Sequence, residues 1–119
     1  MEARPYKTEG FSRIERVKKN GDIQVLFKKG KRVSADGAKL FVLPTGRGIN
    51  RIAFTLPRNY GNAVQRNRSK RLSREAYRRL KSDLKTGYDM ILLVYSGNDS
   101  FEQRCAALRC LCGKAGLFL

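Results

Sequence analysis

The chain has 119 residues, of which 26 are Lys or Arg, 10 are Asp or Glu and none is His, so its formal net charge at pH 7 is +16. This length suits one domain, and the charge excess predicts a polyanionic partner such as RNA, DNA, acidic lipid or an acidic protein. The absence of His removes the commonest general base and metal ligand, and three Cys do not complete a four-ligand zinc site.

The chain lacks the marks of a membrane or secreted protein. Its longest apolar run, Met90–Val94, is far too short to span a bilayer. The N-terminus has no apolar core or cleavage-site pattern of a secretory signal. An odd number of Cys without a pairing rhythm favours a reducing compartment. We therefore expect a cytoplasmic location and no membrane partner.

The N-terminal part is expected to hold a tail and one short helix. Residues 1–12 read as a flexible polar tail, and residues 13–119 as a single domain. Asn20 or Asp22 is suited to cap a helix that Gly30 would end.

Two strands are expected next. Residues 31–37 read as a basic, Gly-containing connection. Lys39–Leu43 reads as a strand that Pro44 stops. Arg51–Leu56 alternates apolar and other residues, as a half-buried strand does, and Pro57 closes it.

A long helix and a buried strand follow. Asn62 with Gln65 predicts a capping box, and the helix is expected to run to about Leu84, before Gly87. Tyr88–Tyr95 is a continuous apolar run, which predicts a strand in the centre of the sheet. Because a long helix separates it from the preceding strand, the two are expected to pair in parallel through a crossover.

The C-terminal residues predict a last helix after a turn at residues 96–100. Phe101, Cys105, Leu108 and Cys112 recur at helical spacing, so the cysteines are expected in the core. The elements together predict an α+β or α/β sandwich, with helices against one small sheet.

The long helix is strongly basic. Residues 58–81 contain nine Lys or Arg, seven of them Arg, and one acid, Glu75. At about 100° per residue, one band of its surface is basic or amide-bearing, formed by Arg66, Lys70, Arg74, Asn67, Arg71 and Arg78. Leu72, Ala76 and Leu80 lie almost opposite, with Tyr77 at the border and Arg68 and Arg79 nearer the apolar edge.

This pattern favours contact with nucleic acid. A solvated helix face normally mixes charge signs for i,i+4 pairing, whereas this face is nearly all positive. Arg presents a planar fork that binds phosphate through two hydrogen bonds. The amide of Asn67 adds a donor and an acceptor for a base edge or a sugar hydroxyl.

The stretches RIAFTL from Arg51 and GNAVQRNRSKRLSREAYR from Gly61 resemble the protein subunit of bacterial ribonuclease P. The resemblance extends over nearly the whole chain, since Asp22–Gly30 is similar to the family's first helix and Gly87–Val94 to its last strand. It implies a ribosomal-protein-S5-like α+β fold in the order helix, three strands, helix, strand, helix, with a four-stranded sheet. It also implies a further strand near residues 31–37 and a left-handed crossover, although general rules favour right-handed ones in about 98% of cases.

The resemblance also implies a function. In that family the protein assists a catalytic RNA, which uses Mg²⁺ to remove the 5′ leader of precursor tRNA, so both RNAs are expected partners and no obligate protein partner, protein-borne catalytic residue or protein metal site is expected. The matching RNA-binding residues here are Arg66, Asn67, Arg68, Lys70, Arg71 and Arg74. The matching leader cleft would contain Ile23, Phe27 and Phe41, with Lys39 and Arg51 as phosphate contacts.

Some residues depart from the family's pattern. Ile23 and Phe41 stand where Phe and Tyr are usual, Ala53 replaces a Gly, and residues 57–59 replace a Ser-Lys-Lys stretch. Ile23 removes one stacking partner for a leader base, and such stacking contributes about 1–3 kcal/mol. Phe27 and Phe41 also fit plain core packing.

Other functions remain open on composition. A ribosomal or assembly protein of similar fold would share the charge. A DNA-binding module is less favoured, because a recognition helix usually offers mixed polar groups to base edges. A protein-only nuclease needs clustered carboxylates, whereas Asp22, Asp36, Asp83, Asp89 and Asp99 are scattered. A membrane-surface helix needs a bulkier apolar face.

Overall fold

A four-stranded mixed sheet forms the centre of the molecule. The computed structural model describes residues 15–97 and 100–119, so the predicted tail, residues 1–12, lies outside the described part. The strands are β1 (Lys31–Ala35), β2 (Ala38–Pro44), β3 (Arg51–Thr55) and β4 (Tyr88–Val94), arranged β1-β2-β4-β3. β4 pairs antiparallel with β2 and parallel with β3. The predicted central place of the last strand is therefore confirmed.

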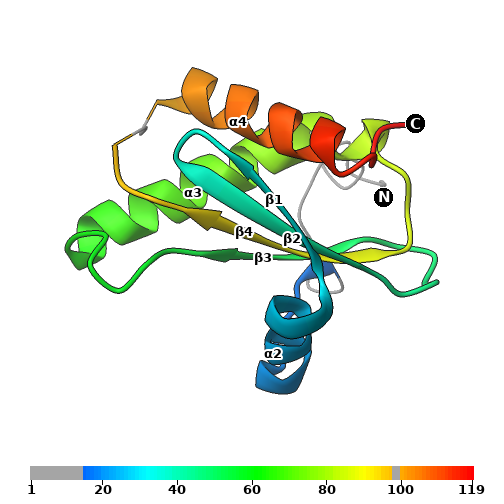
Figure 1. Ribbon diagram of the computed structural model, residues 1–119. Helices are drawn as coiled ribbons and strands as arrows, with labels where there is room; N and C mark the ends of the chain where they lie inside the picture. The colour runs from blue at the N-terminus through cyan, green and yellow to red at the C-terminus, as the bar shows by residue number, and fades with distance from the viewer. Residues whose placement is uncertain (1–14, 98–99) are drawn as a thin grey trace, which may run out of the picture.

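Three α-helices of the described residues lie on the two faces of this sheet. α3 (Ala63–Leu80) and α4 (Phe101–Lys114) lie together on one face, and α2 (Asn20–Lys29) projects from the other (Figure 1). A short 3-10 turn, η2 (Lys81–Asp83), follows α3. The order of the elements and the α+β class agree with the predictions made from the sequence. No helix in the described ranges is long and apolar enough to cross a membrane.

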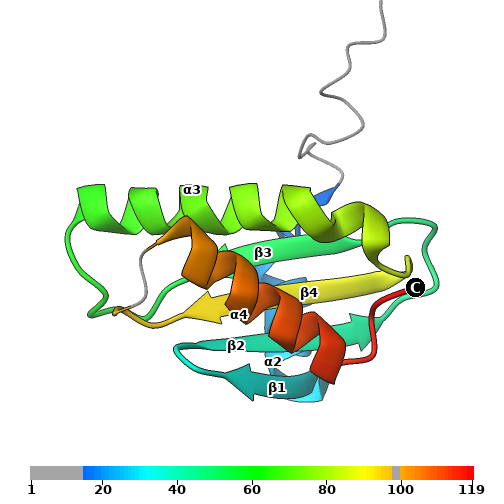
Figure 2. The same ribbon diagram turned by 90° about the horizontal axis from the view of Figure 1, so that it is seen from above.

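The connection through α3 joins two neighbouring parallel strands. In Figure 2, α3 and α4 lie in front of the sheet, and β3 and β4 both point to the left with β4 below β3. When the view is turned so that these two strands point upward, β4 lies to the left of β3. The crossover is therefore left-handed, as the resemblance implies and against the general preference.

β1 is the strand that the residues alone did not reveal. It is an edge strand, and its pattern of mostly exposed basic and small residues lacks a clear apolar face. The turn Asp36-Gly37 joins it to β2, with Gly37 at a φ of +76°. An Asp-Gly pair between two strands is a known hairpin signal, so this turn could have been predicted.

The ends of the helices correct two expectations. α2 has Lys19 at its N-cap without a side-chain cap bond, so capping by Asn20 or Asp22 is wrong. Gly30 does end α2, and a Cβ there would lie 2.5 Å from the carbonyl oxygen of Leu26. No other residue fits that close approach without movement of the chain.

Both long helices on the other face begin with capping boxes. Asn62 Oδ1 accepts from the backbone N–H of Gln65 at 2.9 Å, and Gln65 Oε1 accepts from that of Asn62 at 3.0 Å, as predicted. Ser100 and Gln103 form the same arrangement before α4. α3 ends at Leu80 rather than near Leu84, because the chain tightens into η2.

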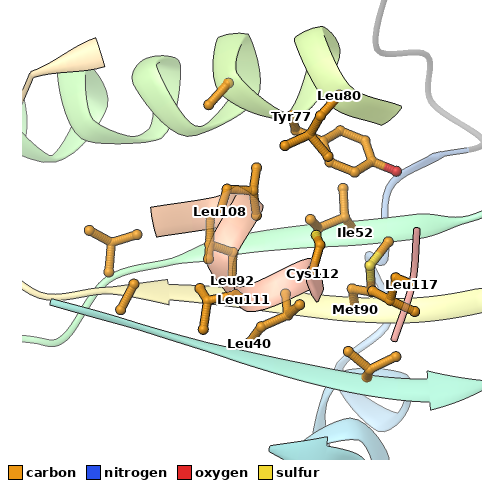
Figure 3. Close-up of a cluster of buried hydrophobic side chains, with 14 of the residues drawn as sticks. Leu40, Ile52, Tyr77, Leu80, Met90, Leu92, Leu108, Leu111, Cys112 and Leu117 are labelled. Atoms are coloured by element: carbon orange, nitrogen blue, oxygen red, sulfur yellow. The ribbon is translucent and has the colours of Figure 1, made fainter. Parts of the chain in front are cut away.

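The main core lies between the sheet and the helix pair α3 and α4 (Figure 3). Cys112 is buried there, and burial raises its pKa to about 12. Cys105 is partly buried against the same core, which agrees with the helical spacing. Cys110, which lies outside that spacing, is exposed. A second, smaller core under α2 contains Leu26, Phe41 and Ile91.

Candidate nucleic-acid interface

The buried face of α3 is not the one that its apolar residues predict. Five residues are buried: Ser69, Ser73, Ala76, Tyr77 and Leu80. Leu72 is only partly buried. At about 100° per residue, the centre of this face lies roughly 45° from that of Leu72, Ala76 and Leu80. The helix is therefore rotated relative to the sequence-based expectation.

This rotation divides the predicted RNA-binding residues into two groups. Asn67, Arg68 and Arg71 are exposed, whereas Arg66, Lys70 and Arg74 are partly buried at the edge of the packed face. Arg68, expected near the apolar edge, stands on the open side.

Arg66 is partly committed to the fold. Its Nη1 donates to the carbonyl oxygen of Pro57 at 2.7 Å, which ties the segment after β3 to the first turns of α3. A guanidinium has five donors in a planar fork, so the remaining ones can still meet a phosphate.

The C-terminal half of α3 adds two cations to the basic surface. Arg78 pairs with Glu75, three residues earlier on the helix. The guanidinium of Arg79 lies over the ring of Phe101, 5.4 Å from its centroid. Together with Ser82, these charged side chains line a hollow of about 460 Å³. Arg79 was not assigned to the basic band in the sequence, because the predicted rotation placed it near the apolar edge.

The opposite face of the sheet gathers the predicted leader-binding residues. Phe41 lies opposite Ile91 in the register of β2 and β4, and Ile23 of α2 packs on the same cluster. The rings of Phe27 and Phe41 meet edge to face, with centroids 4.8 Å apart. Phe41 is 8% exposed and Phe27 42%, so Phe41 belongs to the core and Phe27 offers a ring to solvent.

Lys39 lies on this same face of β2, two residues before Phe41. Its partners across the sheet are Ser34 and Leu93, and its Nζ lies 5.7 Å from the centre of the Tyr95 ring. That distance fits a cation–π contact. Tyr95 was not among the predicted site residues, although it continues the alternation of Ile91 and Leu93 toward the exposed end of β4.

Arg51 is committed to carboxylates. Its Nε and Nη2 donate to the two carboxylate oxygens of Asp89 at 2.8 and 2.5 Å, and Nη2 lies 3.4 Å from Asp22 Oδ2. The hydrogen bond to Asp89 is the main reason that the pKa of Arg51 is raised. The structure thus gives Arg51 a role in holding α2 to the sheet, and the phosphate contact expected from the sequence stays a prediction.

Acidic and sulfur side chains do not gather into a metal centre in residues 15–97 and 100–119. No group of three or more His, Cys, Asp or Glu is placed to hold an ion there.

Comparison with known proteins decides the family. Residues 11–116 match the family described as Ribonuclease P. The chain belongs to this family. A ribonuclease P protein component from Natranaerobius thermophilus is 42% identical over 92 residues, which cover 77% of this chain and 80% of that protein. One from Clostridium kluyveri is 32% identical over 110 residues, covering 88% and 97%.

Solved ribonuclease P proteins share the fold. The Staphylococcus aureus RNase P protein superposes with a TM-score of 0.79 at 27% identity, covering 88% of this chain and 98% of that one. The matched segment includes α2, the sheet and α3, so both surfaces described above lie in the ribonuclease P region. Family membership decides against a ribosomal protein of similar fold.

Proposed function

We propose that this chain is the protein subunit of a ribonuclease P holoenzyme. It binds the catalytic RNA through the exposed side of α3, and the 5′ leader of precursor tRNA through the sheet face beside α2. It thereby assists the endonucleolytic removal of the leader that produces the mature tRNA 5′ end. The observation that carries the proposal is the nearly single-sign exposed face of α3 on a chain of the ribonuclease P family.

The RNA-binding side of the proposal rests on charge and geometry. Arg68 and Arg71 are open to solvent on a helix that a capping box fixes at its first turn. Such a row of cations can neutralise phosphates of an RNA backbone, and this electrostatic term supplies a large share of the binding energy. The partly buried Arg66, Lys70 and Arg74 flank this row and extend it toward the sheet.

The leader-binding side rests on the sheet face. Phe27 offers a partly exposed ring, and Lys39 and Tyr95 place a cation and a second ring further along the same face. Rings that stack on bases, with cations that meet phosphates, form the usual surface for single-stranded nucleic acid. Ile23 supports this surface from α2 without offering a ring.

In this proposal the RNA subunit performs the reaction and holds most of the Mg²⁺. Mg²⁺ prefers phosphate and carboxylate oxygens and keeps several waters. The basic chain lowers the repulsion between the phosphates of the two RNAs, so that the complex forms at a lower Mg²⁺ concentration. The cytoplasm is the compartment that this function implies, and no further protein is required.

The test is a cleavage assay with a precursor tRNA and a transcript of bacterial ribonuclease P RNA. Adding the protein should allow cleavage at a Mg²⁺ concentration at which the RNA alone is slow. Cleavage by the protein without RNA would contradict the proposal, and so would an unchanged Mg²⁺ requirement. Sequencing the RNA that co-purifies with the chain identifies its partner independently.

A further inference from the structure

A buried arginine joins the two helices that cover the sheet. Arg104 of α4 is 2% exposed, and its Nη1 donates to the carbonyl oxygen of Ser69 at 2.8 Å and to Ser73 Oγ at 2.7 Å. Both acceptors lie on the buried face of α3, one helical turn apart. A buried guanidinium is unfavourable unless its hydrogen bonds are well made. Its contacts with α3 are therefore demanding in geometry.

The two serines fit this contact by their size. Among the described residues, Ser69 Oγ is buried and takes no hydrogen bond, although the carbonyl oxygen of the same residue accepts from Arg104. Arg104 thus contacts the backbone of Ser69 and not its hydroxyl. The small side chain lets the guanidinium reach the helix backbone, where a leucine would fill the space.

Three apolar residues of α3, Leu72, Ala76 and Leu80, favour a different rotation, whereas Tyr77, which is 2% exposed, is buried in the observed one. Burying Leu72, Ala76 and Leu80 would turn the helix by roughly 45° from its observed setting. Arg74 and Lys70 would then move toward the open side, and Arg68 and Arg79 toward the packed side. Hydrophobic burial has no preferred direction, so the directional bonds from Arg104 can decide between the two settings.

We infer that Arg104 is a positioning residue that sets the rotation of α3 and thereby selects which arginines meet the RNA. The inference rests on the proposed function, since it concerns the same RNA-binding helix. Arg104 itself is buried and makes no contact with the partner. It acts through Ser69 and Ser73.

The experiment compares alanine substitutions in two backgrounds, with a transcript of bacterial ribonuclease P RNA as the probe. In the native background, Arg68→Ala should lower the salt slope of binding by about one unit, as loss of one phosphate contact does. Arg74→Ala should change it less. In the Arg104→Met background the order should reverse, with Arg74→Ala now producing the larger change.

Matched variants separate rotation from loss of charge or stability. Arg109→Met removes the same charge from an exposed position on α4, and it should leave the order of the two effects as in the native chain. Arg104→Lys keeps a donor. In this background the changes in salt slope caused by Arg68→Ala and Arg74→Ala should therefore lie between those of the native and the Arg104→Met backgrounds. If Arg104→Met does not fold, Ser73→Ala removes one acceptor with little change in volume, and it should shift the order in the same direction.

An unchanged order in Arg104→Met, or in Ser73→Ala where the former does not fold, would overturn the inference. An equal reduction of the salt-slope changes caused by Arg68→Ala and by Arg74→Ala would also overturn the inference, because it would show that Arg104 has a structural role only. If the native chain did not bind the transcript at all, the proposed function would fail instead, so the two failures are distinguishable.

Discussion

Arg51 and Asp89 face each other across the parallel pair of β3 and β4 and form a two-bond ion pair. Their side chains are 15% and 8% exposed. Asp22 of α2 lies on the same guanidinium, so one arginine connects two strands and a helix. This relationship explains how α2 is held at the sheet although no side chain caps its N-terminus.

Arg51→Ala should therefore reduce stability more than it reduces leader binding. Removing one partner of a buried pair leaves an uncompensated charge and typically lowers the free energy of unfolding by about 3–5 kcal/mol. Thermal or urea unfolding measures this. Arg32→Ala, an exposed arginine on the edge strand β1, serves as the control and should leave the melting temperature nearly unchanged. A stable Arg51→Ala variant with a specific loss of leader affinity would show that the phosphate role expected from the sequence is correct.

The exposed arginines of α3 should affect RNA binding without affecting the fold. Arg68→Ala combined with Arg71→Ala should lower the salt slope of RNA binding by about two units at an unchanged melting temperature. Arg66→Ala should in addition lower the free energy of unfolding by about 1 kcal/mol, because its hydrogen bond to the carbonyl of Pro57 is lost. Titrations at several salt concentrations, paired with melting curves, test both statements. A large drop in melting temperature for the double variant would show that this face is structural.

The two aromatic residues beside α2 should separate function from stability. Phe27→Ala removes an exposed ring, so we expect a loss of about 1–3 kcal/mol in the preference for precursor over mature tRNA with a modest change in stability. Phe41→Ala should instead lower the free energy of unfolding by about 3–5 kcal/mol, as truncation of a buried Phe does. Binding of precursors with and without a leader, together with unfolding curves, gives the comparison. Equal binding of both tRNAs by Phe27→Ala and the native chain would count against the leader site.

The three cysteines should differ in reactivity and in their effect on stability. Burial raises the pKa of Cys112 from 9.0 to about 12, so its thiol stays protonated in the folded state. Because the protonated form is the one the fold favours, stability is unaffected below the unfolded pKa and falls as pH rises from about 9 toward 12. At pH 8 a thiol reagent should modify exposed Cys110 rapidly and Cys112 only after unfolding. Mass spectrometry of peptides after timed labelling checks this, and rapid labelling of Cys112 would contradict its place in the core.

Much of the fold was predictable because it depends on neighbouring residues. The capping box at Asn62 and Gln65, the apolar run from Tyr88 and the helical spacing after Phe101 each express local chemistry, and the structure confirms all three. β1 was not predicted from its own residues, because an edge strand needs no apolar pattern. Its strand conformation comes from pairing with β2. The left-handed crossover followed from family resemblance alone, since general rules point the other way.

The residues of the candidate site could be predicted from the sequence, but their arrangement in space could be predicted less well. The charge of α3 and the aromatic residues beside α2 are visible along the chain, and they suffice to indicate a surface for RNA. Which arginines are open depends on Arg104, 31 residues beyond Ser73, and the commitment of Arg51 depends on Asp89, 38 residues away. Directional bonds between distant segments are absent from any local pattern, so the folded chain alone shows how the helix is turned and which cations remain available.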